Sequence, residues 1–183
     1  MAVFRKPKSE QGSTSSRRRR SIDFDSADAA VLTTEIESWV GSNRPKLGEV
    51  MLELGSVDPD DLIEALQHQK ENPTPEGLAR LCDVLLTLGK VDETALAAAL
   101  AQQFGIPLAD LPNETPEQAV LDFVGEELSR KHTVIPLREV DGRVFLAIAD
   151  PLDTVAIEEI TKHCKRIGLL IGTRSEIERL LDR

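Results

Sequence analysis

KLGEVMLELGSVDPDDLIEALQHQ (residues 46–69) and RLCDVLLTLGKVDETALAAALAQQ (residues 80–103) follow one pattern without a gap. The two copies lie 34 residues apart and are identical at 11 of 24 aligned positions. Such agreement over so short a stretch indicates an internal duplication, which is the signature of a repeated supersecondary unit. The duplication therefore decides the fold of the first part of the chain.

The sequence of each copy predicts a helix, a tight turn and a second helix. Gly55 and Gly89 stand where the first helix is expected to end, because glycine adopts the left-handed conformation without a steric penalty. Asp58 and Asp92 follow as expected N-caps of the second helix, and Pro59 suits a first helical position. We therefore predict a tandem helix-turn-helix repeat.

The charge is unevenly distributed along the chain. Residues 1–20 carry a formal charge of +6, which leaves −16 on the rest of a chain whose net charge is −10. We predict a disordered basic tail over residues 1–25, because this stretch has little to bury. Such a tail is a solvated extension, folds back on the acidic body, or binds an anionic membrane surface or nucleic acid. Nucleic acid is the least favoured partner, since the acidic body repels phosphate chains.

A helical pattern precedes the repeat, over residues 27–41. Its apolar residues fall near one face of a 3.6-residue period, with Trp39 beside that face as a packing residue; they are Ala30, Val31, Leu32, Ile36 and Val40.

After the repeat, the pattern changes to alternating strands and helices. Asp141-Gly142 between two apolar runs predicts a type I′ hairpin. The expected elements are a short helix opening at Thr115, a helix over 124–131, strands over 133–140 and 143–149, a helix from Asp153 or Thr154, a strand over 168–172 and a helix from Ser175. The predicted class is α+β, with a helical repeat subdomain at 26–111 and an α-β-β-α-β-α domain at 112–183. Its small mixed sheet is expected to carry helices on one face.

Residue patterns typical of catalysis are missing from the sequence. It has no Walker phosphate loop and no dinucleotide-binding glycine motif, and its three histidines are spread too widely to suggest a metal site. Two cysteines, Cys82 and Cys164, are too few for a disulfide framework and favour an intracellular compartment. No apolar run reaches the length of a transmembrane helix. We expect a non-enzymatic domain without cofactor, metal or catalytic residues.

The two copies resemble the N-terminal domain of type II secretion and type IV pilus assembly ATPases, the MshE, PilB and GspE group. The stretches Gln102–Leu108 and Ile148–Asp153 are similar to that family as well. The resemblance implies a bacterial regulatory domain without the ATPase motor, located in the cytoplasm at the inner membrane, with secretion or pilus assembly proteins as partners. It fits a stand-alone adaptor or the front of a longer ATPase.

The resemblance also implies a ligand, cyclic di-GMP, with each copy holding one half of the dinucleotide. Lys46 and Arg80 would meet phosphate or guanine, the leucines would lie under the purines, Gln69 and Gln103 would bind polar edges, and Asp83 would accept from a guanine amide. The implied ligand-binding residues are Lys46, Leu47, Gly48, Leu62, Leu66, Gln69, Arg80, Leu81, Asp83, Leu96, Leu100 and Gln103.

Two positions depart from the family pattern and support an alternative. Lys46 stands where the family has arginine and lacks its planar fork, while Cys82 replaces a glycine. The alternative hypothesis is a protein-docking module of the same assembly machine that binds no nucleotide, in which the leucines form a helical core.

Overall fold

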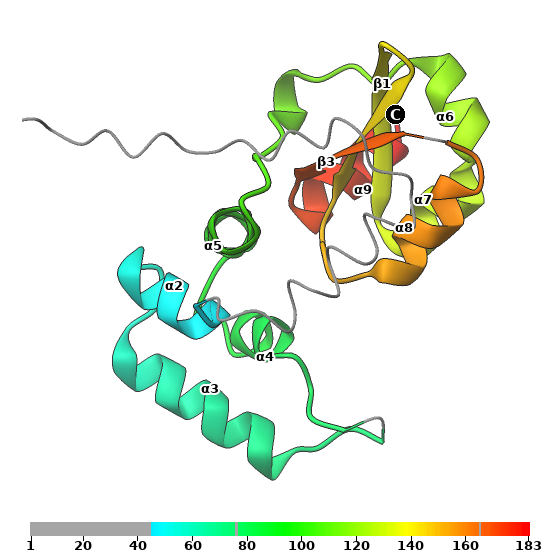
Figure 1. Cartoon of the computed structure of the whole chain (residues 1–183). Helices are drawn as coiled ribbons and strands as arrows, with labels where there is room; N and C mark the ends of the chain where they lie inside the picture. Colours follow the sequence, from blue (N-terminus) through cyan, green and yellow to red (C-terminus); the bar gives the residue numbers. More distant parts are fainter. Residues whose placement is uncertain (1–44, 76, 165) are drawn as a thin grey trace, which may run out of the picture.

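The computed structural model describes residues 45–183 except 76 and 165, and it consists of a helical part followed by a sheet with interleaved helices (Figure 1). The predictions for residues 1–25 and 27–41 lie outside the described residues. The α+β class and the order of elements are confirmed. The helices are α2 (Leu47–Glu53), α3 (Pro59–Glu71), α4 (Leu81–Thr87), α5 (Glu93–Phe104), the 3-10 turn η1 (Leu111–Asn113), α6 (Gln118–Val124), α7 (Glu126–His132), α8 (Thr154–Thr161) and α9 (Arg174–Leu181).

The first helix of each copy ends as the glycine pattern predicted. Gly55 and Gly89 have φ of +65° and +66°. The Gly55 N–H donates to the Leu52 carbonyl at 3.1 Å and the Ser56 N–H donates to the Met51 carbonyl at 2.9 Å. Copy two repeats this pair of hydrogen bonds, which defines a Schellman turn. Duplicated sequence therefore produces duplicated backbone geometry.

The second helices begin at the expected residues but are capped differently. The Asp92 carboxylate accepts a hydrogen bond from the Ala95 N–H at 2.7 Å, as an N-cap should. Asp58 occupies the N-cap position of α3, yet its side chain makes no capping hydrogen bond within the described structure. Pro59 stands at the first position of α3 and has no N–H, so this helix start has one orphan N–H group fewer than usual.

The helices of the two copies pair across the duplication. The first helix of each copy packs along the second helix of the other, so that α2 lies on α5 and α4 lies on α3. The Gln69 Nε2 donates to the carbonyl oxygen of Ala79, and the Gln103 Nε2 donates to that of Pro45 at 3.1 Å. Each glutamine thus holds the backbone that leads into the other copy. The repeat is a single pseudo-twofold bundle and not two independent units.

The sheet has three strands in the order β1 (Val134–Val140), β2 (Arg143–Ile148) and β3 (Ile167–Ile171). β1 and β2 are antiparallel, while β2 and β3 are parallel, which confirms the mixed sheet. Asp141 and Gly142 have φ of +52° and +74°, as a type I′ turn requires. A bulge at Leu137 shifts the register between β1 and β2.

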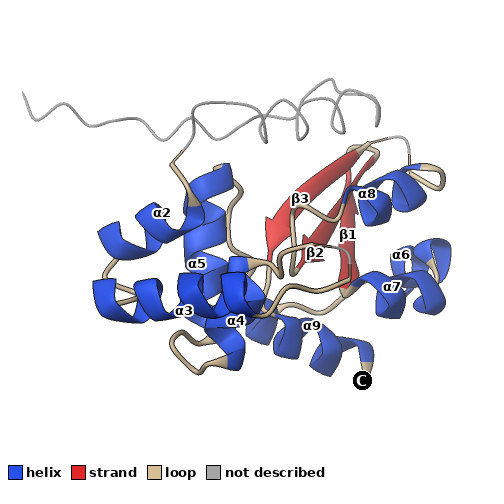
Figure 2. Cartoon of the chain, turned by 90° about the horizontal axis from the view of Figure 1, so that it is seen from below, coloured by secondary structure: helices blue, strands red, loops and turns tan. Residues whose placement is uncertain are grey.

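Helices cover both faces of this sheet, so the expectation of one covered face was wrong (Figure 2). Ile157 and Ile160 of α8 belong to the core on one face, together with Val134 of β1. Ile177 of α9 belongs to a second core on the other face, together with Ile135. The cause lies at the start of β1, where consecutive buried residues replace the in–out alternation of a half-exposed strand.

The repeat and the sheet share one core. The chain leaving α5 runs beside β3, where the Ile171 N–H donates to the Pro107 carbonyl at 2.9 Å and the Ala109 N–H donates to the Ile171 carbonyl at 2.8 Å. A single buried cluster continues from Leu100 and Phe104 of α5 into the sheet. The subdomain boundary at residues 111 and 112 stays a prediction.

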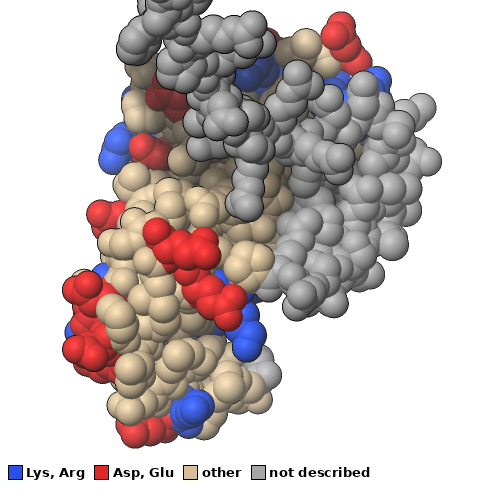
Figure 3. Space-filling model, turned by 60° about the vertical axis from the view of Figure 1, so that its left-hand side comes forward, with Lys and Arg blue, Asp and Glu red and all other residues tan. Residues whose placement is uncertain are grey.

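Acidic side chains gather in separate patches on the face shown in Figure 3, with fewer basic ones and a wide uncharged area between them. This pattern agrees with the negative charge expected for the body of the chain. Within the residues that the structure describes, no helix has the length and hydrophobicity that a membrane crossing demands.

The two Schellman turns yield a prediction about stability. Gly55→Ala and Gly89→Ala should each lower the free energy of unfolding by about 1 kcal/mol, because an L side chain in the left-handed region is strained. A Cβ at either position meets no heavy atom within 4 Å, so a steric clash adds nothing. Urea denaturation measures the loss. Gly55→Asn and Gly89→Asn are the matched controls and should lose less, since asparagine tolerates this conformation; equal losses would contradict the backbone explanation.

Candidate functional site

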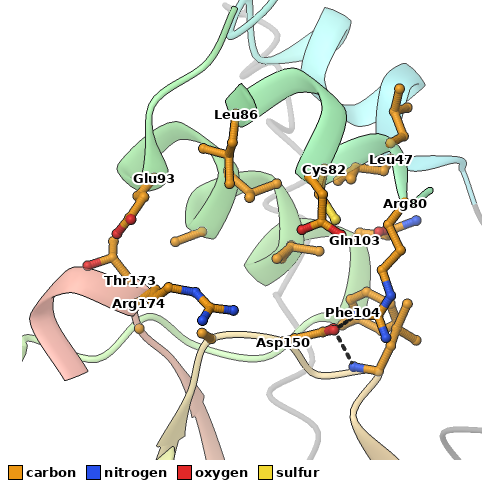
Figure 4. Close-up of a pocket in the computed structure, with 18 residues that line it drawn as sticks. Leu47, Arg80, Cys82, Leu86, Glu93, Gln103, Phe104, Asp150, Thr173 and Arg174 are labelled. Carbon is orange, nitrogen blue, oxygen red and sulfur yellow. Dashed lines mark hydrogen bonds and ion pairs between the residues drawn. The ribbon is translucent and has the colours of Figure 1, made fainter. Parts of the chain in front are cut away.

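A cavity of about 540 Å³ lies between copy two and the sheet domain (Figure 4). Its volume is in the range of pockets that bind small molecules. α4 and α5 form its helical wall, and Leu47 of α2 reaches it from copy one. The loop after β2, at residues 149–152, and the loop before α9, at residues 172–174, form the opposite wall. We call this cavity the interdomain pocket.

The helical wall of the interdomain pocket is mostly apolar. Leu96 and Leu100 of α5 are buried, and Phe104 closes the end of the same helix. Leu81 and Leu86 of α4 are partly buried against the same core. A flat apolar ligand group, such as a purine, would find hydrophobic surface here.

An ion pair crosses the pocket between copy two and the loop after β2. The Arg80 guanidinium contacts the Asp150 carboxylate, with side chains 53% and 33% exposed. The Leu152 N–H donates to the same carboxylate at 2.9 Å and so fixes its orientation. Because both partners are partly exposed, the pair contributes at most about 1 kcal/mol to stability. It leaves the guanidinium within reach of a competing anion.

A second link crosses the pocket at its other side. The Glu93 carboxylate accepts hydrogen bonds from the Ser175 N–H at 2.9 Å and from the Ser175 hydroxyl at 3.0 Å. Figure 4 shows Glu93 beside Thr173 and Arg174, away from Arg80 and Asp150. The sheet domain is thus held to copy two at two points, with the pocket between them.

The charged residues of the pocket are mixed in sign. Arg80 and Arg174 face three acids, Asp83, Glu93 and Asp150. An anionic ligand therefore depends on specific cation contacts and not on a positive field.

Cys82 lines the pocket at the position of copy one's Gly48. Burial, and secondly the neighbouring Asp83 carboxylate, raise the pKa of the Cys82 thiol above its ordinary value. The thiol is therefore protonated and weakly nucleophilic near neutral pH, and we assign it no chemistry.

The structure gathers seven of the twelve predicted ligand-binding residues in the interdomain pocket. They are Leu47, Arg80, Leu81, Asp83, Leu96, Leu100 and Gln103.

The other five, all from copy one, do not line the pocket. Gly48 is buried, and a Cβ there would lie 3.1 Å from the Leu62 side chain, so this glycine permits close packing of α2 on α3. Gln69 is engaged with the Ala79 carbonyl. Lys46 begins α2 at an exposed position, and Leu66 is 38% exposed. Copy one therefore contributes only Leu47 of its predicted residues to the pocket.

Sequence reasoning missed the residues that the sheet domain contributes to the pocket, Asp150 and Arg174 above all. The stretch Ile148–Asp153 had been singled out by resemblance, which was the available signal. Nothing in its spacing could place it against α4. Glu93 lies in the first turn of α5, where an acid is common, so nothing in the sequence indicated that it contacts the loop before α9.

Among residues 45–183, with 76 and 165 left out, no group of three or more histidine, cysteine or acidic side chains is arranged to hold a metal ion.

Comparison with known proteins identifies the family to which the chain belongs. The MshEN domain family matches residues 104–183. The solved N-terminal domain of XpsE is 32% identical, with 74% of this chain and 91% of that structure covered and a TM-score of 0.51. The chain belongs to the MshEN family of N-terminal domains of PilB/GspE-type pilus and secretion ATPases.

A further solved structure, MshE with cdg, is 27% identical to this MshEN chain, with a TM-score of 0.65. The matched region covers 76% of this chain and 99% of the MshE structure, so the similarity extends beyond residues 104–183 into the repeat.

Curated relatives are much longer proteins. The type IV pilus assembly ATPase PilB of Thermus thermophilus is 32% identical over 170 residues, which cover 75% of this chain and 19% of PilB. The type II secretion system protein E of Xanthomonas campestris pv. campestris is 33% identical over 147 residues, which cover 78% of this chain and 25% of that protein. This MshEN chain spans about a fifth to a quarter of these relatives.

The raised pKa of Cys82 gives a test of the pocket's environment. In a Cys164→Ser background, alkylation of the folded chain at pH 8 should be slower than that of the urea-unfolded chain, because a raised pKa leaves less thiolate. The alkylation rate of Cys82 should rise with pH over a range that lies above the range for a free cysteine, because the pKa of its thiol is raised. Asp83→Asn should lower the pKa and speed alkylation at pH 8; an unchanged rate would show that the Asp83 carboxylate does not act on the thiol.

Proposed function

We propose that this MshEN chain is a regulatory domain that binds cyclic di-GMP in the interdomain pocket and thereby controls a type IV pilus or type II secretion system. The observation that carries the proposal is that seven of the twelve predicted ligand-binding residues line one pocket. The structure of MshE with cdg, to which the chain is similar, supports the choice of ligand.

The pocket's chemistry matches one half of such a ligand. Arg80 supplies a cation for phosphate or guanine, and Asp83 supplies an acceptor for a guanine amide. Leu96 and Leu100 provide apolar surface for the purine ring. Cyclic di-GMP is twofold symmetric, so its second half would extend toward copy one at Leu47, the copy-one residue of the predicted set that lines the pocket.

Binding would be coupled to the position of the sheet domain. A phosphate that reaches Arg80 competes with the Asp150 carboxylate for the same guanidinium. Loss of the Arg80–Asp150 ion pair on binding would free the loop after β2, which leads directly into α8. The proposed location is the cytoplasmic side of the inner membrane, where pilus and secretion ATPases would receive this signal.

Isothermal calorimetry at physiological salt tests the ligand. Wild type should give saturable heat with cyclic di-GMP, and Arg80→Ala should weaken binding at least tenfold, since a hydrogen bond to a charged group is worth about 1.5–3 kcal/mol. Gln103→Ala should weaken it less. Arg179→Ala removes an exposed arginine that does not line the pocket and is the matched control. Far-UV circular dichroism verifies folding, and a folded wild type without saturable heat would refute the proposal.

A second candidate function is docking of another protein without nucleotide. The acidic side chains in the pocket favour it, because they oppose binding of an anionic nucleotide. Leu152 and Val155 also favour it, because their apolar side chains are 38% and 54% exposed at the loop after β2 and the start of α8. The calorimetric experiment separates the two, because docking of this kind predicts no heat with the dinucleotide. Binding of a purified assembly protein that is lost in Val155→Glu would then support docking.

A further inference from the structure

Arg174 is the cationic side chain on the wall of the interdomain pocket that lies opposite the helices of copy two. It is the first residue of α9, and its side chain extends from the loop before that helix into the pocket (Figure 4). Arg80, the other arginine of the pocket, stands at the start of α4 on the helical wall. The two guanidinium groups therefore reach the pocket from opposite walls.

The guanidinium of Arg174 is open to a ligand, whereas that of Arg80 is engaged by the Asp150 carboxylate. Arg174 Nη1 lies 4.0 Å from Glu178 Oε1, and no other carboxylate of the described residues comes as close to it. The two side chains of this pair are 63% and 55% exposed, so the pair adds little to stability. An anion that enters the pocket can contact Arg174 without displacing a strong ion pair.

The acid that lies beside Arg174 on the pocket wall is bound to a different residue. Figure 4 shows Glu93 next to Arg174, yet each of its carboxylate oxygens accepts a hydrogen bond from Ser175. The N–H of Ser175 belongs to the first turn of α9, where the helix dipole favours a negative charge. Glu93 therefore holds the start of α9 in place and does not neutralise Arg174.

The backbone that carries Arg174 is fixed on both sides of this residue. The Thr173 hydroxyl accepts from the Glu176 N–H at 3.2 Å and donates to the Glu176 carboxylate at 2.8 Å. Gly172 is packed so closely that a Cβ there would lie 2.6 Å from the Leu111 side chain. The arginine thus projects from a rigid loop, and a ligand that binds it has little backbone to order.

The apolar and the cationic surfaces of the pocket lie on different walls. Leu96 and Leu100 are buried on the helical wall and suit a purine ring. A phosphate does not lie against such a surface, because burying a charge without a polar partner is costly. A nucleotide whose base rests on the two leucines turns its phosphate away from them, toward the wall where Arg174 stands. The exposure of Arg174 leaves that phosphate partly hydrated.

We propose that Arg174 binds a phosphate of the dinucleotide from the wall opposite the purine, so that the ligand is held between Arg80 and Arg174. This inference rests on the proposed binding of cyclic di-GMP in the interdomain pocket. Because Arg174 begins α9, the bound ligand would itself connect copy two to the helix that covers one face of the sheet. This connection would replace the Arg80–Asp150 contact that the ligand displaces.

Calorimetry with cyclic di-GMP at physiological salt tests the contact. Arg174→Ala should weaken binding about three- to tenfold, because the lost contact is charge-assisted but partly exposed. Arg174→Lys should keep most of the affinity, since a phosphate accepts a point charge, and Arg174→Glu should lose more than alanine does. Arg179→Ala removes the same charge from an exposed position on the same helix and should bind as wild type does.

The outcomes separate this inference from the proposed function, with far-UV circular dichroism as the test of folding. A folded wild type that does not bind would overturn both. Wild-type binding with unchanged affinity in Arg174→Ala would overturn the Arg174 contact alone. An Arg174→Lys variant as weak as Arg174→Ala would overturn the assignment to phosphate.

Glu178→Gln tests whether Arg174 acts on the ligand or only through its own helix. This change removes the carboxylate nearest to the guanidinium and should leave the affinity for cyclic di-GMP unchanged or higher. A loss as large as that of Arg174→Ala would show that the pair within α9 matters and would overturn the proposal.

Discussion

The structure depends on one interaction: the first helix of each copy of the repeat packs against the second helix of the other copy. α2 packs on α5 and α4 packs on α3, so each copy covers apolar side chains of the other. Gln69 and Gln103 reinforce the exchange by binding the backbone that precedes the opposite copy. A two-copy repeat is too short for a solenoid, in which each unit stacks on the next. Because the helices pair between the copies, two copies are enough to form a buried core. The sheet and its helices pack against this bundle.

The pocket follows from a break in the bundle's symmetry. One domain can cover only one of two equivalent faces, and the backbone bonds between Ile171 and residues 107–109 fix the sheet beside α5. Copy two thereby gains a second wall, with Asp150 opposite Arg80. A repeat that is identical at 11 of 24 positions thus becomes structurally asymmetric, because Leu86 and Leu100 line the pocket while Leu52 and Leu66 of copy one are exposed.

The parts of this fold that depend on local geometry were predictable from sequence. Gly55, Gly89 and the Asp141-Gly142 pair each require a positive φ that few residues tolerate, so their positions fix turns. The cap at Asp92 is also local, because its carboxylate accepts from an N–H three residues later. The second covered face of the sheet was not predictable with the same ease, because the buried run at the start of β1 is consistent with either arrangement until α9 is placed.

The candidate site was predictable in its helical wall and not in the loops that face this wall. Spacing identifies Arg80, Leu96 and Gln103 as equivalents of copy-one residues, but it carries no information about which copy meets the sheet domain. Asp150 lies 70 residues from Arg80 and joins it only through the tertiary fold. An ion pair between the repeat and the loop after β2 is set by long-range packing, which neither periodicity nor propensity encodes. In the proposed function, a phosphate at Arg80 would compete with Asp150 for the same guanidinium, so that ligand binding and the position of the loop after β2 would be linked through this one group.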